Sequence, residues 1–464
     1  MALFLFELRR LARSPFLWCT AALTLVVCTL WNRDFAFNVS AETVEISTVM
    51  LLPAAGTTYA ACLATSRDQR YGMPATLEAL PVRASGHTLA VLLAASTVAG
   101  AVAALVTVAY LLGRLAVSGP VAGRFDLFEA LTGMAVAVFA AALGTAAGRW
   151  IPSLFAAPLT ITFGACLQVT GNALWNYRPG GEWLAPVNLM IDLPVEAASR
   201  PSGWHLTYVA GLAVLLGAVA LLKHGTSRGR IIAVIAALVV AVPSAAIATR
   251  SGGRITGSPE LKADRCHDIR GVSYCAYQDY AAWIPEWAQT VQPVIDAAPH
   301  AVKGRVTKVR QSPSGSSDSE RPTSQTVYAG TAWGEVFRRH LAGEVAALMV
   351  GLAPRRPSVG HRDEPSCDAS GQARTVVGLW LMGQASPPGR LTLRTELGAT
   401  VQARGSDVAY AERLLMTADA GERIRANWET LINPKTTIEQ ALPLLGLQRD
   451  QTPSSEGSEL PKCA

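Results

Sequence analysis

The sequence predicts an α-helical polytopic membrane protein that carries a large C-terminal domain. Three observations support this: apolar runs of bilayer length recur through residues 15–249, basic residues cluster beside them, and residues 250–464 become polar. A helix of roughly 20 apolar residues crosses the hydrocarbon core and satisfies its own backbone polar groups there. The overall hydrophobic content of 50% hides this division. The modest net charge of +6, held in short clusters beside the apolar runs, argues against nucleic-acid binding.

Residues 1–14 predict a cytoplasmic helix that lies in the membrane interface, because apolar and basic side chains occupy different helical faces. The apolar face holds Phe4, Leu8 and Leu11, and the basic face holds Arg9, Arg10 and Arg13. An ordinary positively charged flank, which sets topology and does nothing else, explains the same residues equally well.

Apolar runs bounded by charged or turn residues predict about seven spans by the length criterion, six of them a core and one extra. They lie near 15–31, 47–65, 88–112, 127–148, 153–175, 205–222 and 231–249. We expect the first run to be retained rather than cleaved as a signal peptide, because no small-residue cleavage site follows Trp31.

Lys and Arg set the orientation, because they resist translocation and stay in the cytoplasm. With the N-terminus inside, the cytoplasmic segments hold Arg9, Arg10, Arg13, Arg67, Arg70, Arg83, Arg149, Lys223, Arg228 and Arg230. The opposite connections hold the smaller set Arg33, Arg114, Arg124, Arg178 and Arg200. This asymmetry predicts a cytoplasmic N-terminus and places residues 250–464 outside the cell.

The connection 66–87 predicts a second cytoplasmic element. Pro74 suits the first turn of a helix, and Met73, Leu77 and Leu80 fall on one side of it. A short amphipathic helix of this kind can dock in a groove of a soluble partner, with its apolar side chains supplying affinity and the flanking arginines fixing orientation.

At these two elements the chain resembles a known family, the permease subunits of type-two ABC exporters, particularly the actinobacterial ones. The resemblance covers roughly residues 1–222 and rests on the segments 7–15, 67–72 and 77–82. It implies that the first segment is an elbow helix, with Glu7, Arg9, Arg10 and Arg13. It also implies that the loop holds a coupling helix that meets the ATPase, with Arg67, Arg70, Met73, Leu77, Glu78 and Leu80. The family pattern further includes a helical hairpin on the outer side, for which residues 182–199 are apolar enough.

The permease interpretation requires a partner, because the chain has neither a G-x-x-x-x-G-K-[ST] loop nor any Gly-Lys dipeptide. We therefore expect no cofactor on this chain and no catalytic site, with ATP and Mg held by a separate ABC ATPase subunit. The resemblance also implies a homodimer, or a heterodimer with a second permease, in a bacterial plasma membrane.

Polar residues inside the predicted spans are few. Scarce charge argues against a proton- or ion-coupled transporter. Gln168 and Asn172, four residues apart, would share a helical face and line a substrate path, but hydrogen bonding between helices explains them more simply. Gly144 and Gly148 form a G-x-x-x-G pattern, which is typical of a close-packing face.

Residues 250–464 predict a mostly helical α+β domain. Helical periodicity marks 280–298, 333–353, 371–385, 408–418 and 421–432, and strand patterns mark 305–310, 326–329 and 391–400. Residues 311–324 predict a loop. The cysteines favour the pairs Cys266–Cys275 and Cys367–Cys463 in an oxidising compartment, with four free thiols as the alternative. No metal motif or catalytic motif occurs, so the competing function is a polytopic anchor that presents an extracellular sensor or binding domain.

Overall fold

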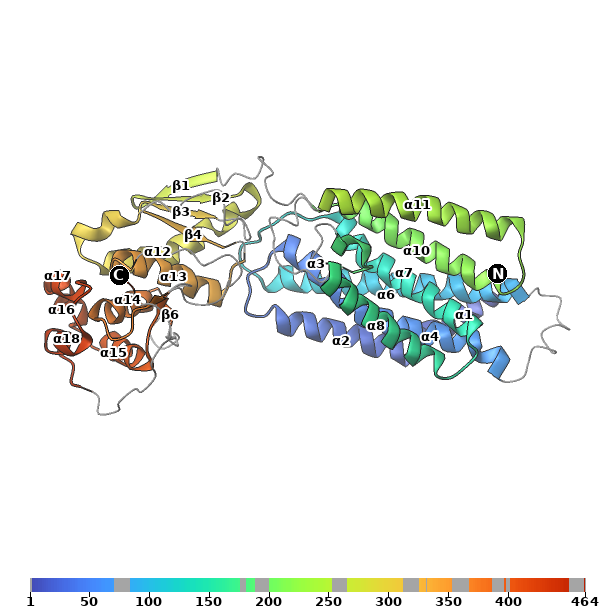
Figure 1. Ribbon diagram of the computed structural model, residues 1–464, viewed down its shortest axis with the longest axis horizontal. Coiled ribbons are helices and arrows are strands. Elements are labelled where there is room, and N and C mark those ends of the chain that lie inside the picture. The colour runs from blue at the N-terminus through green and yellow to red at the C-terminus, as the bar shows by residue number, and fades with distance from the viewer. Residues whose placement is uncertain are drawn as a thin grey trace. The chain divides into compact units, whose positions relative to one another are not determined.

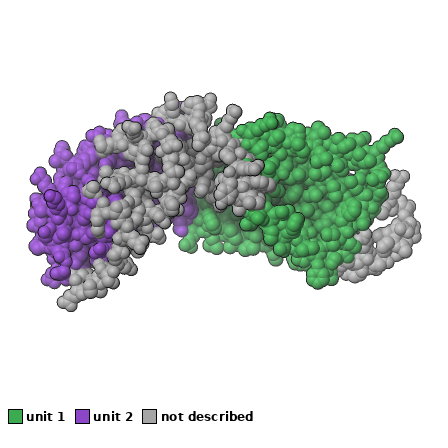
Figure 2. Space-filling model, viewed as in Figure 1, with its two compact units in different colours: residues 1–33, 37–259 green, residues 34–36, 260–464 purple. Residues whose placement is uncertain are grey.

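The structure, a computed structural model, describes residues 2–70, 84–175, 181–187, 200–252, 265–311, 325–330, 332–352, 367–385, 396–397, 401–449 and 463. The chain divides into two compact units (Figure 2). The first comprises residues 1–33 and 37–259, and the second comprises residues 34–36 and 260–464.

The first unit is built of helices, the longest of which run side by side (Figure 1). In chain order they are α1 (Ala2–Ala12), α2 (Pro15–Trp31), α3 (Val39–Val49), α4 (Leu51–Arg70), α6 (Ala84–Val117), α7 (Leu127–Trp150), α8 (Ala156–Trp175), η1 (Gly181–Leu184), α10 (Ser202–Leu222) and α11 (Arg228–Gly252). Among the described residues, 5 helices are long and apolar enough to cross a membrane, or up to 6 if α1 and α2 form one span with a 49° bend. The expectation of a mostly helical chain with several apolar spans is therefore met.

Two predicted spans differ from the observed helices. The second, 47–65, begins inside α3, and helical structure already starts at Val39, where the Asn38 side chain accepts from the backbone N–H groups of Ser40 and Ala41. The chain changes from α3 to α4 at Met50, just before Pro53, which has no N–H to continue the hydrogen-bond ladder. The fifth, 153–175, is helical from Ala156 onwards, and its apolar part Ala156–Thr170 is shorter than a full span.

Helix α7 lies at the centre of the first unit and packs against α4, α6 and α10. Its Gly144 and Gly148 permit the close approach of α4. A Cβ atom on Gly144 would lie 2.4 Å from the Thr58 carbonyl oxygen, and one on Gly148 would lie 2.4 Å from that of Cys62. The G-x-x-x-G pattern is therefore a packing face, as its spacing predicts.

The second unit contains two small sheets and several helices (Figure 1). Its strands are β1 (Arg265–Ile269), β2 (Val272–Ala276), β3 (Lys308–Gln311), β4 (Thr326–Ala329), β5 (Cys367–Asp368), β6 (Glu396–Leu397) and β7 (Val401–Gln402). Its helices are η2 (Gln278–Trp283), α12 (Ile284–Ala297), η3 (His300–Arg305), α13 (Glu335–Met349), α14 (Ala373–Gly383), α15 (Gly405–Leu415), α16 (Ala420–Ala426), α17 (Trp428–Leu431) and α18 (Ile438–Leu445). The sheet orders are β1-β2-β3-β4 and β5-β7-β6, with β1 antiparallel to β2 and the β2-β3-β4 pairs parallel.

The core of the second unit is aromatic and aliphatic. Trp283, Trp287 and Trp333 are fully buried, and the rings of Trp287 and Trp333 lie 6.2 Å apart. Every residue of α14 is buried, because it packs between α13 and α15 and carries apolar side chains all around.

Several elements of the second unit differ from the sequence prediction. The β1–β2 hairpin was not predicted; its turn places Arg270 and Gly271 at positive φ. The predicted strand 305–310 is displaced to Lys308–Gln311, because a 3-10 helix occupies the residues before it. Strand β4 covers the predicted 326–329, whereas the predicted loop 311–324 lies almost wholly outside the described residues.

Candidate functional site

The structure describes only the two ends of the predicted coupling segment, which we call its stems: the last turn of α4 and the first turn of α6. Met73, Leu77, Glu78 and Leu80 lie outside the described residues, and Arg70 ends α4 without a described side chain. Arg67, in the last turn of α4, and the first turn of α6 flank the segment. The stems show what holds this segment to the rest of the first unit.

The side chain of Glu7 in α1 binds both stems. It is fully buried, with a relative exposure of 0%. Its Oε1 lies 3.0 Å from Nη2 of Arg67, and 3.8 Å from Nε2 of His87 in the first turn of α6. Its Oε2 lies 3.7 Å from Nη1 of Arg10. One carboxylate thus joins the predicted elbow helix to both ends of the predicted coupling segment.

The charge of Glu7 depends on these partners. Burial raises the pKa of the Glu7 carboxyl, but the hydrogen bond from His87 and the charge of Arg67 outweigh burial and leave the pKa below its ordinary value of 4.5. The carboxylate is therefore ionised at neutral pH and attracts both stems.

Helix α1 is held by packing as well as by charge. Leu11 is buried, and Phe4 and Leu8 pack against the same core cluster, which includes residues of α6. Arg9, Arg10 and Arg13 are exposed on the opposite side. The division of faces is the one that the sequence pattern indicates.

A second set of polar contacts binds Thr88, the residue that follows His87 in α6. The Nε of Arg149, at the end of α7, donates to Nε2 of His224 over 3.0 Å, and Oγ1 of Thr88 lies 2.8 Å from the same nitrogen. Burial and the charge of Arg149 lower the pKa of His224 to about 4, so the ring is neutral and accepts at Nε2. His224 follows α10, so this contact joins the ends of α7 and α10 to the start of α6.

His87 and Thr88 are adjacent, so the first turn of α6 is bound on one side to α1 and on the other to α7 and α10. Polar contacts thus connect the residues that flank the segment between α4 and α6 to three other helices, α1, α7 and α10. No local pattern marks His87, Thr88, Arg149 or His224 as site residues, because their partners lie far away in sequence.

The predicted substrate-path residue Gln168 is buried, and its Nε2 donates to the carbonyl oxygen of Val187, in the segment that follows η1. This contact is a packing hydrogen bond between a helix and a connecting segment. Asn172 lies on the same helix, and its side chain is outside the described part of the chain. Most of the predicted outer hairpin 182–199 is likewise undescribed.

A further buried polar cluster lies at the other end of the first unit, where α2 ends and α3 begins. The guanidinium of Arg114 binds the Glu42 carboxylate, with Nη2 at 2.7 Å from Oε1. The Nδ2 of Asn32 donates to Glu45 over 2.7 Å and to the Tyr110 hydroxyl over 3.0 Å. The i, i+3 spacing of Glu42 and Glu45 on one helix face was the available signal. It was missed because residues 32–46 were predicted to be a connection between two spans, whereas helix α3 already begins at Val39.

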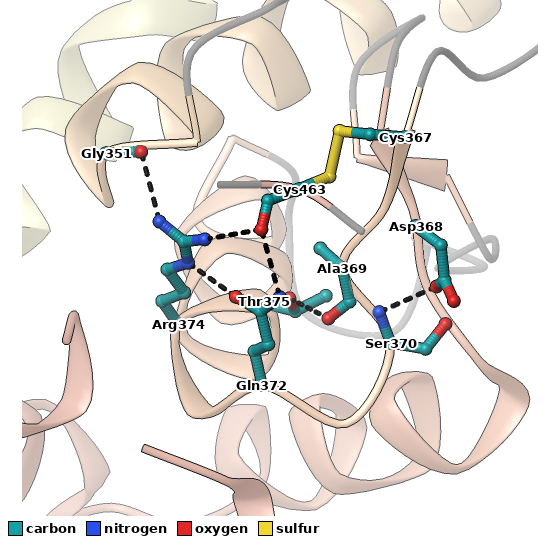
Figure 3. Close-up of a disulfide and its surroundings, with 9 residues drawn as sticks. All are labelled: Gly351, Cys367, Asp368, Ala369, Ser370, Gln372, Arg374, Thr375 and Cys463. Atoms are coloured by element: carbon teal, nitrogen blue, oxygen red, sulfur yellow. Dashed lines mark hydrogen bonds between the residues drawn. A yellow bond between two sulfur atoms is a disulfide. The ribbon is translucent and has the colours of Figure 1, made fainter. Parts of the chain in front are cut away.

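The structure joins Cys367 to Cys463 and Cys266 to Cys275, the pairing that the sequence favours. Figure 3 shows the surroundings of the first disulfide, where Arg374 reaches the carbonyl oxygens of Gly351 and Cys463. The backbone N–H of Cys463 also donates to the Asp368 carbonyl over 3.0 Å. These contacts hold Cys463 against β5 and the start of α14.

Within the described residues, no group of three or more His, Cys, Asp or Glu side chains is placed to hold a metal ion. Comparison of the chain with protein-family models, with curated proteins and with solved structures finds no match. The functional assignment therefore depends on the residues and contacts described above.

Proposed function

We propose that this chain is the permease subunit of an ATP-driven exporter and works with a separate ATPase subunit. The observation that carries the proposal is the Glu7 contact, because it binds the elbow-like helix α1 to both stems of the coupling-like segment. The span-length apolar helices and the resemblance of residues 1–222 support it. ATP and Mg would be bound by the partner, and a homodimer or a heterodimer with a second permease would form the transport path.

In this mechanism, ATP binding closes the ATPase pair and displaces the segment between α4 and α6. Arg67 and His87 carry the displacement to Glu7 and α1, while Thr88 carries it through His224 to α7 and α10. Packed helix bundles respond to such a displacement by switching between discrete arrangements. The substrate path would thereby open towards alternate sides of the membrane.

The proposed orientation places the N-terminus and the coupling segment in the cytoplasm of a bacterial cell and the second unit outside. The distribution of Lys and Arg supports it. The two disulfides support it independently, because disulfides persist in oxidising compartments.

The test is copurification of an ABC ATPase subunit from the native host with the parent protein and with the double variant Leu77→Asp, Leu80→Asp. We expect the double variant to lose the ATPase, because two carboxylates would have to be buried in an apolar groove. The matched control is Met416→Asp, which introduces a carboxylate at an apolar residue that is 89% exposed on the second unit. Equal recovery of the ATPase with all three proteins contradicts the coupling role.

A second candidate function is a polytopic anchor for an extracellular sensor or binding domain. It is favoured by the second unit, which has its own buried core and two disulfides. This candidate predicts that no ATPase copurifies and that function survives when the second unit is attached to an unrelated membrane anchor.

A further inference from the structure

Residues 34–36 connect α2 to α3, yet they belong to the second unit. They pair with residues 333–335 in an antiparallel arrangement. The backbone N–H of Ala36 donates to the Trp333 carbonyl over 2.8 Å, and that of Glu335 lies 3.4 Å from the Asp34 carbonyl. Phe35 and Gly334 form the bridge between these two bonds. The second unit therefore includes a short strand contributed by a loop between two helices of the first unit.

The contact requires glycine at position 334. Gly334 has φ +150°, and a Cβ atom there would lie 2.3 Å from the Asp34 carbonyl oxygen. The Phe35 ring lies 6.1 Å from the Phe337 ring, and the neighbouring Trp333 is fully buried against Trp287. The 34–36 segment is thus attached to the core of the second unit rather than to a surface loop.

In the sequence, Arg33 alone separates the 34–36 segment from Asn32, which belongs to the polar cluster of α2, α3 and α6. Asn32 is buried and bonds to Glu45 and Tyr110, which brings together the end of α2, the middle of α3 and the last third of α6. The Glu42–Arg114 ion pair joins α3 to α6 beside it. A force on residue 34 therefore acts within two residues on three helix ends.

We propose that the 34–36 segment is the connection through which the second unit restrains the ends of α2, α3 and α6 where this cluster lies. The second unit then regulates the helix movements of the membrane unit and is more than an attached cargo domain. Only the transport readout below rests on the proposed function.

The test is hydrogen exchange on the full-length protein in lipid nanodiscs, with the variant Gly334→Ala and the matched control Gly304→Ala. A Cβ on Gly304 meets nothing within 4 Å. In Gly334→Ala we expect at least about tenfold faster exchange at Ala36, because its amide loses the Trp333 carbonyl. We also expect faster exchange in peptides that contain Asn32 and Glu45. The control should match the parent protein at all three places.

Two results overturn the proposal. One is an Ala36 amide that is already unprotected in the parent protein. The other is an opened 34–36 segment with unchanged exchange around Asn32 and Glu45. If Gly334→Ala does not yield folded protein, Phe337→Ala decides, since it removes the ring contact and leaves the backbone free to pair; it should accelerate the same peptides by a smaller factor.

A transport assay with the ATPase bound separates this inference from the proposed function. A changed transport rate in Gly334→Ala with normal ATPase recovery supports regulation by the second unit, and an unchanged rate contradicts it. If the parent protein recovers no ATPase, the proposed function fails, while the exchange result still decides whether the restraint exists.

Discussion

The ion pairs of the two units differ in burial. In the first unit, ion pairs are buried between different helices: the side chains of Glu42 and Arg114 are 3% and 10% exposed. In the second unit, ion pairs such as Glu439–Arg449 lie at the surface, with both side chains more than 60% exposed. Breaking a buried pair costs about 3–5 kcal/mol, whereas an exposed pair contributes about 0.2–1 kcal/mol. Charge therefore positions helices in the first unit, and the aromatic core and disulfides do so in the second.

The largest expected effect comes from breaking a buried pair. Glu42→Gln leaves the Arg114 guanidinium buried without its counter-charge, so we expect the first unit to lose about 3–5 kcal/mol. The matched control, Glu439→Gln, should change stability by less than about 1 kcal/mol. The measurement is the rate of maleimide labelling of the buried thiol Cys28, which is 2% exposed. Similar labelling in the two variants would show that charge does not position these helices.

We expect a smaller difference in stability between variants that lack one or the other disulfide of the second unit. They enclose sequence separations of 96 and 9 residues. Loop entropy alone makes the longer closure more stabilising by about 2 kcal/mol. We therefore expect Cys367→Ser, Cys463→Ser to destabilise the second unit by about 2–5 kcal/mol, and Cys266→Ser, Cys275→Ser to do so by less. Pulse proteolysis of the full-length proteins measures both; the reverse order would contradict an entropic origin.

The smallest expected effect is a pH dependence at His224. Its pKa is about 4 in the fold and ordinarily 6.5, so the unfolded chain binds the proton more readily. The stability contributed by the neutral ring is complete above pH 6.5 and is lost as the pH falls towards 4. Besides Arg149, the charged groups that act on this ring are Arg230 and His87. The pKa of Glu7 is lowered from its ordinary value of 4.5, so the stability that its carboxylate contributes is lost as the pH falls through that lowered pKa.

The measurement is thermal unfolding between pH 4.5 and 7.5 for the parent protein and for His224→Gln. The parent should lose melting temperature on acidification more steeply than the variant. Equal slopes would mean that the Arg149–His224–Thr88 contact does not set the acid sensitivity of this end of the first unit.

Apolar length and basic flanks were enough to predict most of the long helices of the first unit, because a helix able to cross a bilayer needs a minimum apolar length. They did not predict α3, and the apolar helix in the predicted span 153–175 is shorter than expected. The polar contacts between helices could not be predicted. Glu42 and Arg114 are 72 residues apart in sequence, and Glu7 and Arg67 are 60 apart. Nothing in local periodicity indicates which distant side chain will neutralise a buried charge.

In the second unit, different features could not be predicted from the sequence. The β1–β2 hairpin was missed because its strands are short and contain His267 and Asp268, which interrupt the expected alternation. The cysteine pairing, by contrast, could be chosen from only a few connectivities. Residues 34–36 were beyond reach, since no sequence pattern assigns a loop between two apolar helices to a domain that begins more than 200 residues later.

Helix α6 has 34 residues, so it is a rod of about 51 Å, longer than the roughly 30 Å of a bilayer's hydrocarbon core. Its two ends carry His87 and Arg114, which sit in the two separate polar clusters. A stiff rod acts as a lever: a tilt of about 5° pivoting at His87 would shift the Arg114 end by roughly 3–4 Å, given the helical rise. That is enough to pull a salt bridge apart, so a small tilt at one end of α6 would break the Glu42–Arg114 pair at the other.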